Sequence, residues 1–177
     1  MPVDPEGQTP HLILGGAKSG KSAYAERLVA SYPAPYIYVA TAQVFDGEMA
    51  HRVQEHRRRR GVSWETVESP FELVKVLGTY LGGHTAVLVD CLTLWLSNLL
   101  LRTPDQSLDG EVRGLVDFIQ AVDYPLFLVS NEVGGGIVPE NALARSFRDL
   151  AGSVNQQVAV ACRAVTLVIA GLPLRLK

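Results

Sequence analysis

The stretch GGAKSGKS, residues 15–22, decides the fold of this chain. It fits the pattern G-x-x-x-x-G-K-[ST] of a phosphate-binding loop, or P-loop, at every fixed position. The apolar run HLILGG at 11–16 leads into it and predicts a buried strand, and residues 21–32 predict a helix. A chance glycine-rich turn would not need a strand before it and a helix after it, whereas the motif requires both. The sequence therefore predicts a site for a nucleoside triphosphate.

The chemistry of phosphate binding explains the residue types in this loop. Its glycines let backbone N–H groups turn toward phosphate oxygens, and the N-terminus of the following helix adds a partial positive charge. Lys21 can reach the β- and γ-phosphates, and the hydroxyl of Ser22 can bind Mg²⁺. The whole loop is predicted to contact the nucleotide: Gly15, Gly16, Ala17, Lys18, Ser19, Gly20, Lys21 and Ser22.

Outside the loop, strand-like and helix-like segments alternate. Short runs rich in apolar and β-branched residues predict further strands at 35–41, 63–68, 85–90, 124–134 and 165–171. Longer segments predict helices at 46–60, 69–81, 92–101, 108–122 and 139–164. The Ser69–Pro70 pair is typical of a helix start, with Ser69 as its cap. This alternation predicts an α/β fold with a mainly parallel sheet and helices on both faces.

Composition indicates one packed domain. Of the 177 residues 47% are hydrophobic and 19% charged, which fits a single domain at 11–177 after a disordered extension at 1–10. The balance of 16 basic and 18 acidic residues argues against a nucleic-acid surface. We expect no membrane span and no signal peptide. Cys91 and Cys162 lie in apolar segments and are expected to be reduced core thiols of a cytoplasmic protein.

A second carboxylate is expected near a magnesium-bound triphosphate, at the end of a neighbouring strand. The run AVLVD at 86–90 provides Asp90 in that position, where parallel sheets place their sites. The alternative is a charged residue that simply ends a strand. Ser22 and Asp90 are thus the predicted metal ligands. These parts do not decide the reaction, because kinases, transferases and mechanical ATPases share them.

The predicted helix at 46–60 carries two histidines and a run of four arginines. Met49, Val53 and His56 share one face at helical spacing, whereas His51 points nearly opposite. His56 is either a satisfied core residue or, beside phosphate-binding arginines, a nucleophile on phosphorus. The arginines are either a phosphate clamp or a solvated basic helix end: Arg57, Arg58, Arg59 and Arg60.

Several segments together resemble one family. They are GGAKSGKS, YVATAQVFDGEMAHRVQEHRRRR, VDCLT, VSNEVGGGIVPENALARSFRDLAGSVNQ and VTLVIAGLPLRLK. They are similar to the bifunctional adenosylcobinamide kinase / adenosylcobinamide-phosphate guanylyltransferases of cobalamin (vitamin B12) biosynthesis, over nearly the whole chain from residue 11.

This resemblance implies a specific chemistry. ATP or GTP would phosphorylate adenosylcobinamide, and GMP from GTP would then pass through a guanylyl-histidine to give adenosylcobinamide-GDP. The matching histidine is His56; the family often has a second histidine just before it, where this chain has Glu55. The resemblance also implies Mg²⁺, a RecA-like P-loop core and a homotrimer. It extends the nucleotide contacts to Ala40, Thr41, Arg57, Arg58, Arg59, Arg60, Glu68 and Asp90.

Two other classes stay open on the residues alone. Another small-molecule P-loop kinase would need neither His56 nor the arginine run. A RecA-like ATPase module would need a basic nucleic-acid surface, against which the acidic balance argues.

Overall fold

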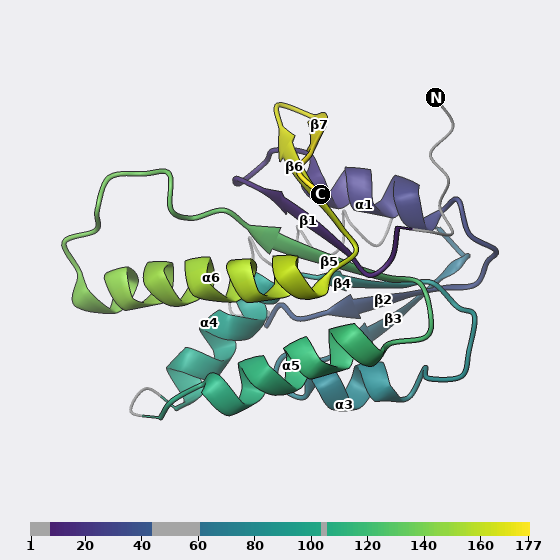
Figure 1. Cartoon of the computed structure of the whole chain (residues 1–177), viewed down its shortest axis with the longest axis horizontal. Coiled ribbons are helices and arrows are strands. Elements are labelled where there is room, and N and C mark those ends of the chain that lie inside the picture. Colours follow the sequence, from purple (N-terminus) through teal and green to yellow (C-terminus); the bar gives the residue numbers. More distant parts are fainter. Residues whose placement is uncertain (1–7, 44–60, 104–105) are drawn as a thin grey trace.

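The computed structural model describes residues 8–43, 61–103 and 106–177, which form a layered α/β structure (Figure 1). Its centre is a seven-stranded sheet of order β3-β2-β4-β5-β1-β6-β7. Neighbouring strands run parallel except β7, which pairs antiparallel with β6. The strands are β1 (His11–Gly15), β2 (Tyr36–Ala40), β3 (Trp64–Glu68), β4 (Val87–Asp90), β5 (Leu126–Asn131), β6 (Ala164–Ile169) and β7 (Leu172–Arg175).

Helices cover both faces of the sheet (Figure 1). Helix α1 (Lys21–Val29) lies on one face. The opposite face carries α3 (Leu73–Gly78), α4 (Leu92–Arg102), α5 (Asp109–Ala121) and α6 (Ala142–Ala161). The predicted fold class, a mainly parallel sheet between two helical layers, is confirmed.

Alternation along each strand separates two apolar clusters. In β4, Val87 and Val89 pack against the cluster that includes α3–α6, and Leu88 packs against the cluster that includes α1. Side chains of a strand point to its two faces in turn. Asp90, which ends β4 two residues after Leu88, therefore faces α1.

One predicted helix start is wrong. The segment 69–81 was expected to be helical from a Ser69 cap, but α3 covers only Leu73–Gly78. Ser69 is buried, and its N–H donates to the carbonyl of Ala40 at 2.8 Å. Pairing with the end of β2 therefore holds this backbone extended past the end of β3.

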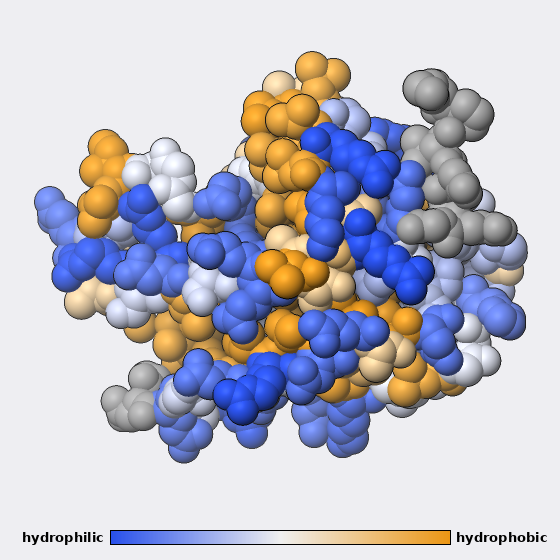
Figure 2. Space-filling model, in the orientation of Figure 1, coloured by the Kyte–Doolittle hydropathy of each residue, from blue (hydrophilic) through white to orange (hydrophobic). Residues whose placement is uncertain are grey.

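The C-terminal segment contains a hairpin that the sequence did not indicate. A single strand was predicted at 165–171, but the chain reverses at Ala170 and Gly171, both with positive φ, and returns as β7. Figure 2 shows apolar surface gathered over this hairpin. Its exposed side chains include Ile169, Leu172 and Leu174.

The remaining expectations concern the two cysteines, the segments outside the described residues and a membrane span. Cys91 and Cys162 are free and buried, as predicted. The predicted helix at 46–60 and residues 1–7 of the predicted extension lie outside the described residues. Within the described ranges, no helix is long and apolar enough to cross a membrane.

Candidate nucleotide-binding site

The loop at 15–22 connects β1 to α1 at the carboxyl edge of the sheet. Lys21 is half-buried, and its Nζ donates to the carbonyl of Gly16 at 3.1 Å. The N–H of Ser19 donates to the same carbonyl at 3.2 Å. Lys18 and Gly20 have φ of 55° and 94°. The loop is thus folded back on itself, with Lys21 curled over it as an anion-binding loop requires.

Two glycines of this loop are required by close packing. A Cβ on Gly15 would lie 2.6 Å from the carbonyl oxygen of Val168 in β6. A Cβ on Gly20 would lie 3.2 Å from Cα of Gly171, whose N–H donates to the carbonyl of Ser19 at 2.8 Å. The P-loop therefore packs directly against the β6–β7 hairpin. Gly16, in contrast, has open space around it.

The other predicted residues of the described chain form a row along the same edge. The register pairs Ala40 of β2 with Asp90 of β4 on one side and with Glu68 of β3 on the other. Asp90 has the phase of Leu88, and Ala40 the phase of Tyr38, both of which pack on the α1 side. Asp90, Ala40 and Glu68 therefore share a sheet face with α1, which begins at Lys21.

The charges of Asp90 and Lys21 both affect the pKa of the buried Cys91 thiol. Burial and then the Asp90 carboxylate raise the pKa of Cys91 to about 12, and the Lys21 ammonium acts in the opposite sense. Both charges thus act on one buried thiol. The structure thus places Lys21, at the start of α1, and Asp90, at the end of β4, on the same face of the sheet at its carboxyl edge.

Thr41 has a structural role that the sequence did not reveal. It is fully buried, and its hydroxyl donates to the carbonyl of Cys91 at 2.7 Å and accepts from the N–H of Cys91 at 2.8 Å. Asn98 of α4 donates to the carbonyl of Thr41 at 2.8 Å. The Thr41 side chain thus links the segment that follows β2 to the segment that follows β4.

The segment after β5 belongs to the site, although no role for it was derived from spacing. Asn131 pairs with Gly15 in the parallel register, and the N–H of Glu132 donates to the carbonyl of Gly15 at 3.1 Å. The N–H of Gly134 donates to the Glu132 carboxylate at 2.7 Å, and the carbonyl of Gly134 accepts from Arg148. Only the sheet order reveals that this segment adjoins the P-loop.

Several predictions lie outside the described residues: His56 and the four arginines, Arg57, Arg58, Arg59 and Arg60. Of the other histidines, His11 is buried and hydrogen-bonded to Thr166 at 2.9 Å, and His84 is exposed. Among described residues, no group of three or more His, Cys, Asp or Glu side chains could hold a metal. The oxygens of Ser22 and Asp90 are nevertheless the donor type that suits Mg²⁺.

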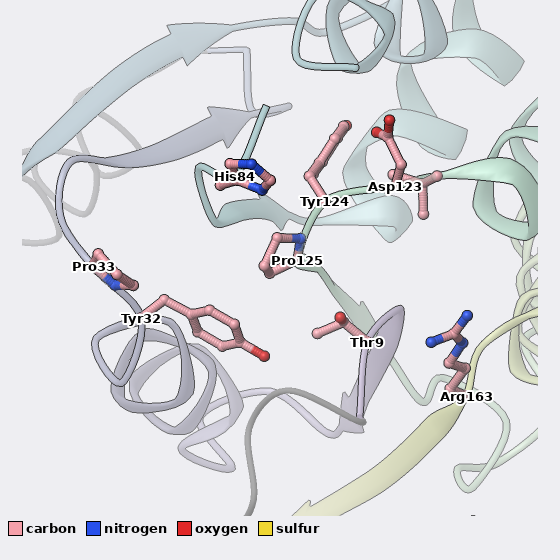
Figure 3. A pocket seen from close by; sticks show the side chains of 9 residues that line it. Thr9, Tyr32, Pro33, His84, Asp123, Tyr124, Pro125 and Arg163 are labelled. Atoms are coloured by element: carbon pink, nitrogen blue, oxygen red, sulfur yellow. The ribbon is translucent and has the colours of Figure 1, made fainter. Parts of the chain in front are cut away.

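A separate cavity of about 380 Å³ lies at the opposite edge of the sheet (Figure 3). Thr9, His84 and Arg163, which line it, come just before β1, β4 and β6. The cavity therefore sits at the amino ends of the strands, away from the P-loop. None of the predicted site residues that the structure describes lines it.

Residues 11–176 match the family model described as cobinamide kinase / cobinamide phosphate guanyltransferase. The chain belongs to this family. The match spans the P-loop, the row at the carboxyl edge and the β6–β7 hairpin, so the site lies wholly within the family's domain.

Curated relatives agree along nearly the whole chain. The bifunctional adenosylcobalamin biosynthesis protein CobP of Pseudomonas aeruginosa is 48% identical, covering 94% of this chain and 96% of that protein. The bifunctional adenosylcobalamin biosynthesis protein CobU of Escherichia coli K12 is 40% identical, covering 94% of this chain and 98% of that protein.

Solved structures support the fold class alone. A type III secretion system ATPase superposes with a TM-score of 0.54 at 11% identity, covering 96% of this chain and 57% of that protein. The protein PH0250 from Pyrococcus horikoshii OT3 also gives 0.54, at 10% identity, covering 97% and 86%. This likeness fits an α/β P-loop NTPase.

Proposed function

We propose that this protein catalyses two consecutive reactions on adenosylcobinamide in cobalamin biosynthesis. ATP or GTP phosphorylates a hydroxyl of adenosylcobinamide, and a GMP unit from GTP is then joined to the new phosphate to give adenosylcobinamide-GDP. The observation that supports this proposal is the complete P-loop, with Lys21 at the start of α1 and Asp90 at the end of β4 on the face that α1 covers, in a chain that belongs to this family.

In the kinase step, the substrate hydroxyl oxygen bonds to the γ-phosphorus. The bond from that phosphorus to the β–γ bridging oxygen breaks, a nucleoside diphosphate leaves, and the hydroxyl proton is released. The backbone N–H groups of the P-loop and the Lys21 ammonium hold the phosphates and offset the charge that develops on them. Lys21 is already curled over the loop through its bond to the Gly16 carbonyl.

In the transferase step, we propose His56 as the nucleophile. Its ring nitrogen bonds to the α-phosphorus of GTP and pyrophosphate leaves, which gives a guanylyl-histidine; the phosphate of the corrinoid then displaces the histidine. A covalent intermediate replaces one difficult transfer by two easier ones. Arg57, Arg58, Arg59 and Arg60 are proposed as phosphate contacts, because arginine forms forked hydrogen bonds to phosphate.

Mg²⁺ is proposed to bind with the nucleotide, between Ser22 and Asp90. Ser22 lies in the first turn of helix α1 and is half-buried, and Asp90 ends β4 on the face that α1 covers. A hydroxyl and a carboxylate are both hard oxygen donors, and Mg²⁺ binds to few protein ligands beside phosphates and water. The ion would neutralise phosphate charge when bound.

The homotrimer and the cytoplasmic location are also proposals. The β6–β7 hairpin supports an assembly, since its edge strand exposes Leu172 and Leu174, at 72% and 56% of their surface. Edge strands with apolar side chains tend to be covered by another chain. The two buried free thiols are consistent with a reducing compartment. Sedimentation equilibrium tests the trimer, and a monomer at micromolar concentration would exclude it.

One labelling experiment tests the central proposal. The protein is incubated with Mg²⁺ and α-labelled GTP, denatured, and examined for acid-labile, base-stable label. We expect label on the wild type and on His51→Ala, which is the matched control from the same predicted helix, and none on His56→Ala. Label on His56→Ala would exclude the guanylyl-histidine. Separately, no transfer of γ-phosphate to adenosylcobinamide would remove the kinase half.

A further inference from the structure

Asn131 ends β5, and the sheet order gives this position a special place. β5 lies between β1, which leads into the P-loop, and β4, which ends at Asp90. Neighbouring strands are about 4.8 Å apart, so β1 and β4 are separated by about 10 Å. A side chain at the end of β5 therefore stands between the loop that holds the phosphates and the carboxylate opposite.

The phase of β5 directs the side chain of Asn131 toward α1. Phe127 and Val129 pack in the cluster under α1, whereas Leu126 and Leu128 pack in the cluster on the other face. Asn131 follows Phe127 and Val129 at a period of two and so lies on the α1 side, where Lys21 and Ser22 begin the helix. Its amide Nδ2 lies 3.9 Å from Sγ of Cys91.

Glu132, the neighbouring polar residue, is placed differently. By the same alternation it belongs to the face opposite α1. One of its carboxylate oxygens already accepts the N–H of Gly134 at 2.7 Å. The alternation thus selects Asn131 and not Glu132 as the residue that reaches the phosphate side.

The backbone of Asn131 is held firmly on both sides. Its N–H donates to Oγ1 of Thr93 at 2.7 Å, and its carbonyl accepts from Nδ2 of Asn155 at 3.1 Å. Both partners sit on helices of the other face, α4 and α6. A side chain on a backbone fixed in this way is pre-positioned, which is what a group that contacts a reacting phosphate needs.

The carboxamide itself retains hydrogen-bonding capacity. A thiol is a weak acceptor, so the contact with Cys91 leaves the amide N–H groups largely available. Within the described part of the chain, no hydrogen bond joins the Asn131 carboxamide to any other side chain or carbonyl. The Cys91 sulfur that it approaches is also the atom on which the charges of Lys21 and Asp90 act.

We propose that Asn131 is a catalytic residue of the kinase step, whose carboxamide N–H donates a hydrogen bond to the γ-phosphate of the nucleotide. It thereby lets the site distinguish a triphosphate from a diphosphate. This inference rests on the proposed function, because it assumes a triphosphate on the P-loop. Lys21 reaches the β- and γ-phosphates from the loop side, and Asn131 meets the γ-phosphate from the β5 side.

The test compares three proteins in two measurements. Asn131→Ala is set against the wild type and against Ser130→Ala, a matched control one residue earlier whose side chain faces Thr93 on the other side of β5. Equilibrium binding is measured for Mg²⁺ with the β,γ-imido analogue of GTP and, separately, for Mg²⁺ with GDP. Thermal unfolding checks that each variant is folded.

For Asn131→Ala we expect triphosphate-analogue affinity to fall roughly ten- to a hundredfold, the usual range for a hydrogen bond to a charged group. GDP affinity should change less than threefold, because GDP has no γ-phosphate. Kinase kcat should fall by more than the rate of protein guanylylation, since the latter reaction occurs at the α-phosphorus. Ser130→Ala should keep the wild-type ratio of the two affinities.

The possible outcomes separate the two claims. If Asn131→Ala leaves the ratio of triphosphate-analogue affinity to GDP affinity unchanged, whether or not both affinities fall, the inference is overturned while the proposed function stays intact. A wild type that binds neither nucleotide would overturn the proposed function and this inference with it. A ratio that changes only in Asn131→Ala supports the inference, and Asn131→Asp should then discriminate against the triphosphate even more strongly, because a carboxylate repels it.

Discussion

Replacing Gly15 by alanine should damage both the fold and nucleotide binding, because space is lacking on two sides. The added Cβ would overlap Oγ of Ser19 and would lie 2.6 Å from the carbonyl oxygen of Val168. The Ser19 hydroxyl can rotate away, but the Val168 carbonyl belongs to the backbone of β6. β1 and β6 must therefore separate, or the loop must move.

The magnitude follows from the cost of overpacking. Inserting a methyl group into a well-packed region costs about 1–3 kcal/mol. For a domain of this size each 1 kcal/mol lowers Tm by about 2–4 °C, so Gly15→Ala should lower Tm by roughly 2–12 °C. Because the clash involves Ser19 and thus the path of the loop, GTP affinity should fall at least about tenfold, a cost near 1.4 kcal/mol.

The adjacent glycine supplies the control. A Cβ on Gly16 meets no atom within 4 Å, and Gly16 does not have a positive φ. Gly16→Ala should therefore keep the wild-type Tm without nucleotide. Calorimetry gives Tm and isothermal titration gives the affinity. Equal Tm values for Gly15→Ala and the wild type, or equal losses in the two variants, would refute the packing argument.

Three further predictions concern other parts of the molecule. Gly171→Ala forces a side chain onto a φ of 79° where the hairpin meets the P-loop, so it should cost about 1–2 kcal/mol in urea unfolding and weaken GTP binding. Burial and then Arg175 lower the pKa of His11 to about 4 in the folded protein. Protons therefore bind the unfolded chain first as the pH falls below 6.5, and the free energy of unfolding should drop by about 2 kcal/mol between pH 7 and 4.5. His11→Asn should abolish this loss. Asn98→Ala leaves the carbonyl of Thr41 without its donor and should cost about 1–3 kcal/mol in the same assay, whereas an unchanged unfolding midpoint would show that water replaces the amide.

The sequence predicted what depends on local chemistry. The P-loop and the apolar run before Asp90 are contiguous signals, so the loop, its strand and its helix were found where the structure has them. Ser69 shows the limit of such signals: a serine before a proline is a good helix start, but its N–H is bonded to Ala40, which lies far away in the sequence. Tertiary pairing overrides the local preference there.

The parts that the sequence did not reveal depend on the order of the strands. The turn at Ala170 carries a positive φ on an alanine, which no residue-type rule would suggest, and so the hairpin behind the P-loop was missed. Asn131 carried no assignable role until β5 was seen between β1 and β4. Spacing along the chain does not encode which strand becomes a neighbour of the P-loop.

Two proposed reactions and one P-loop impose an order on the chemistry. The motif occurs once in the chain, so a kinase nucleotide and a transferase GTP cannot occupy it together. The kinase reaction needs the γ-phosphorus exposed to the corrinoid hydroxyl, whereas guanylylation needs the α-phosphorus exposed to His56. Asn131, at the end of β5, is proposed to contact the γ-phosphate, which takes part in the first of these reactions. In the proposed scheme both nucleotides use the P-loop, so the diphosphate product leaves before GTP donates its GMP, and a site that binds a triphosphate more tightly than a diphosphate favours that exchange.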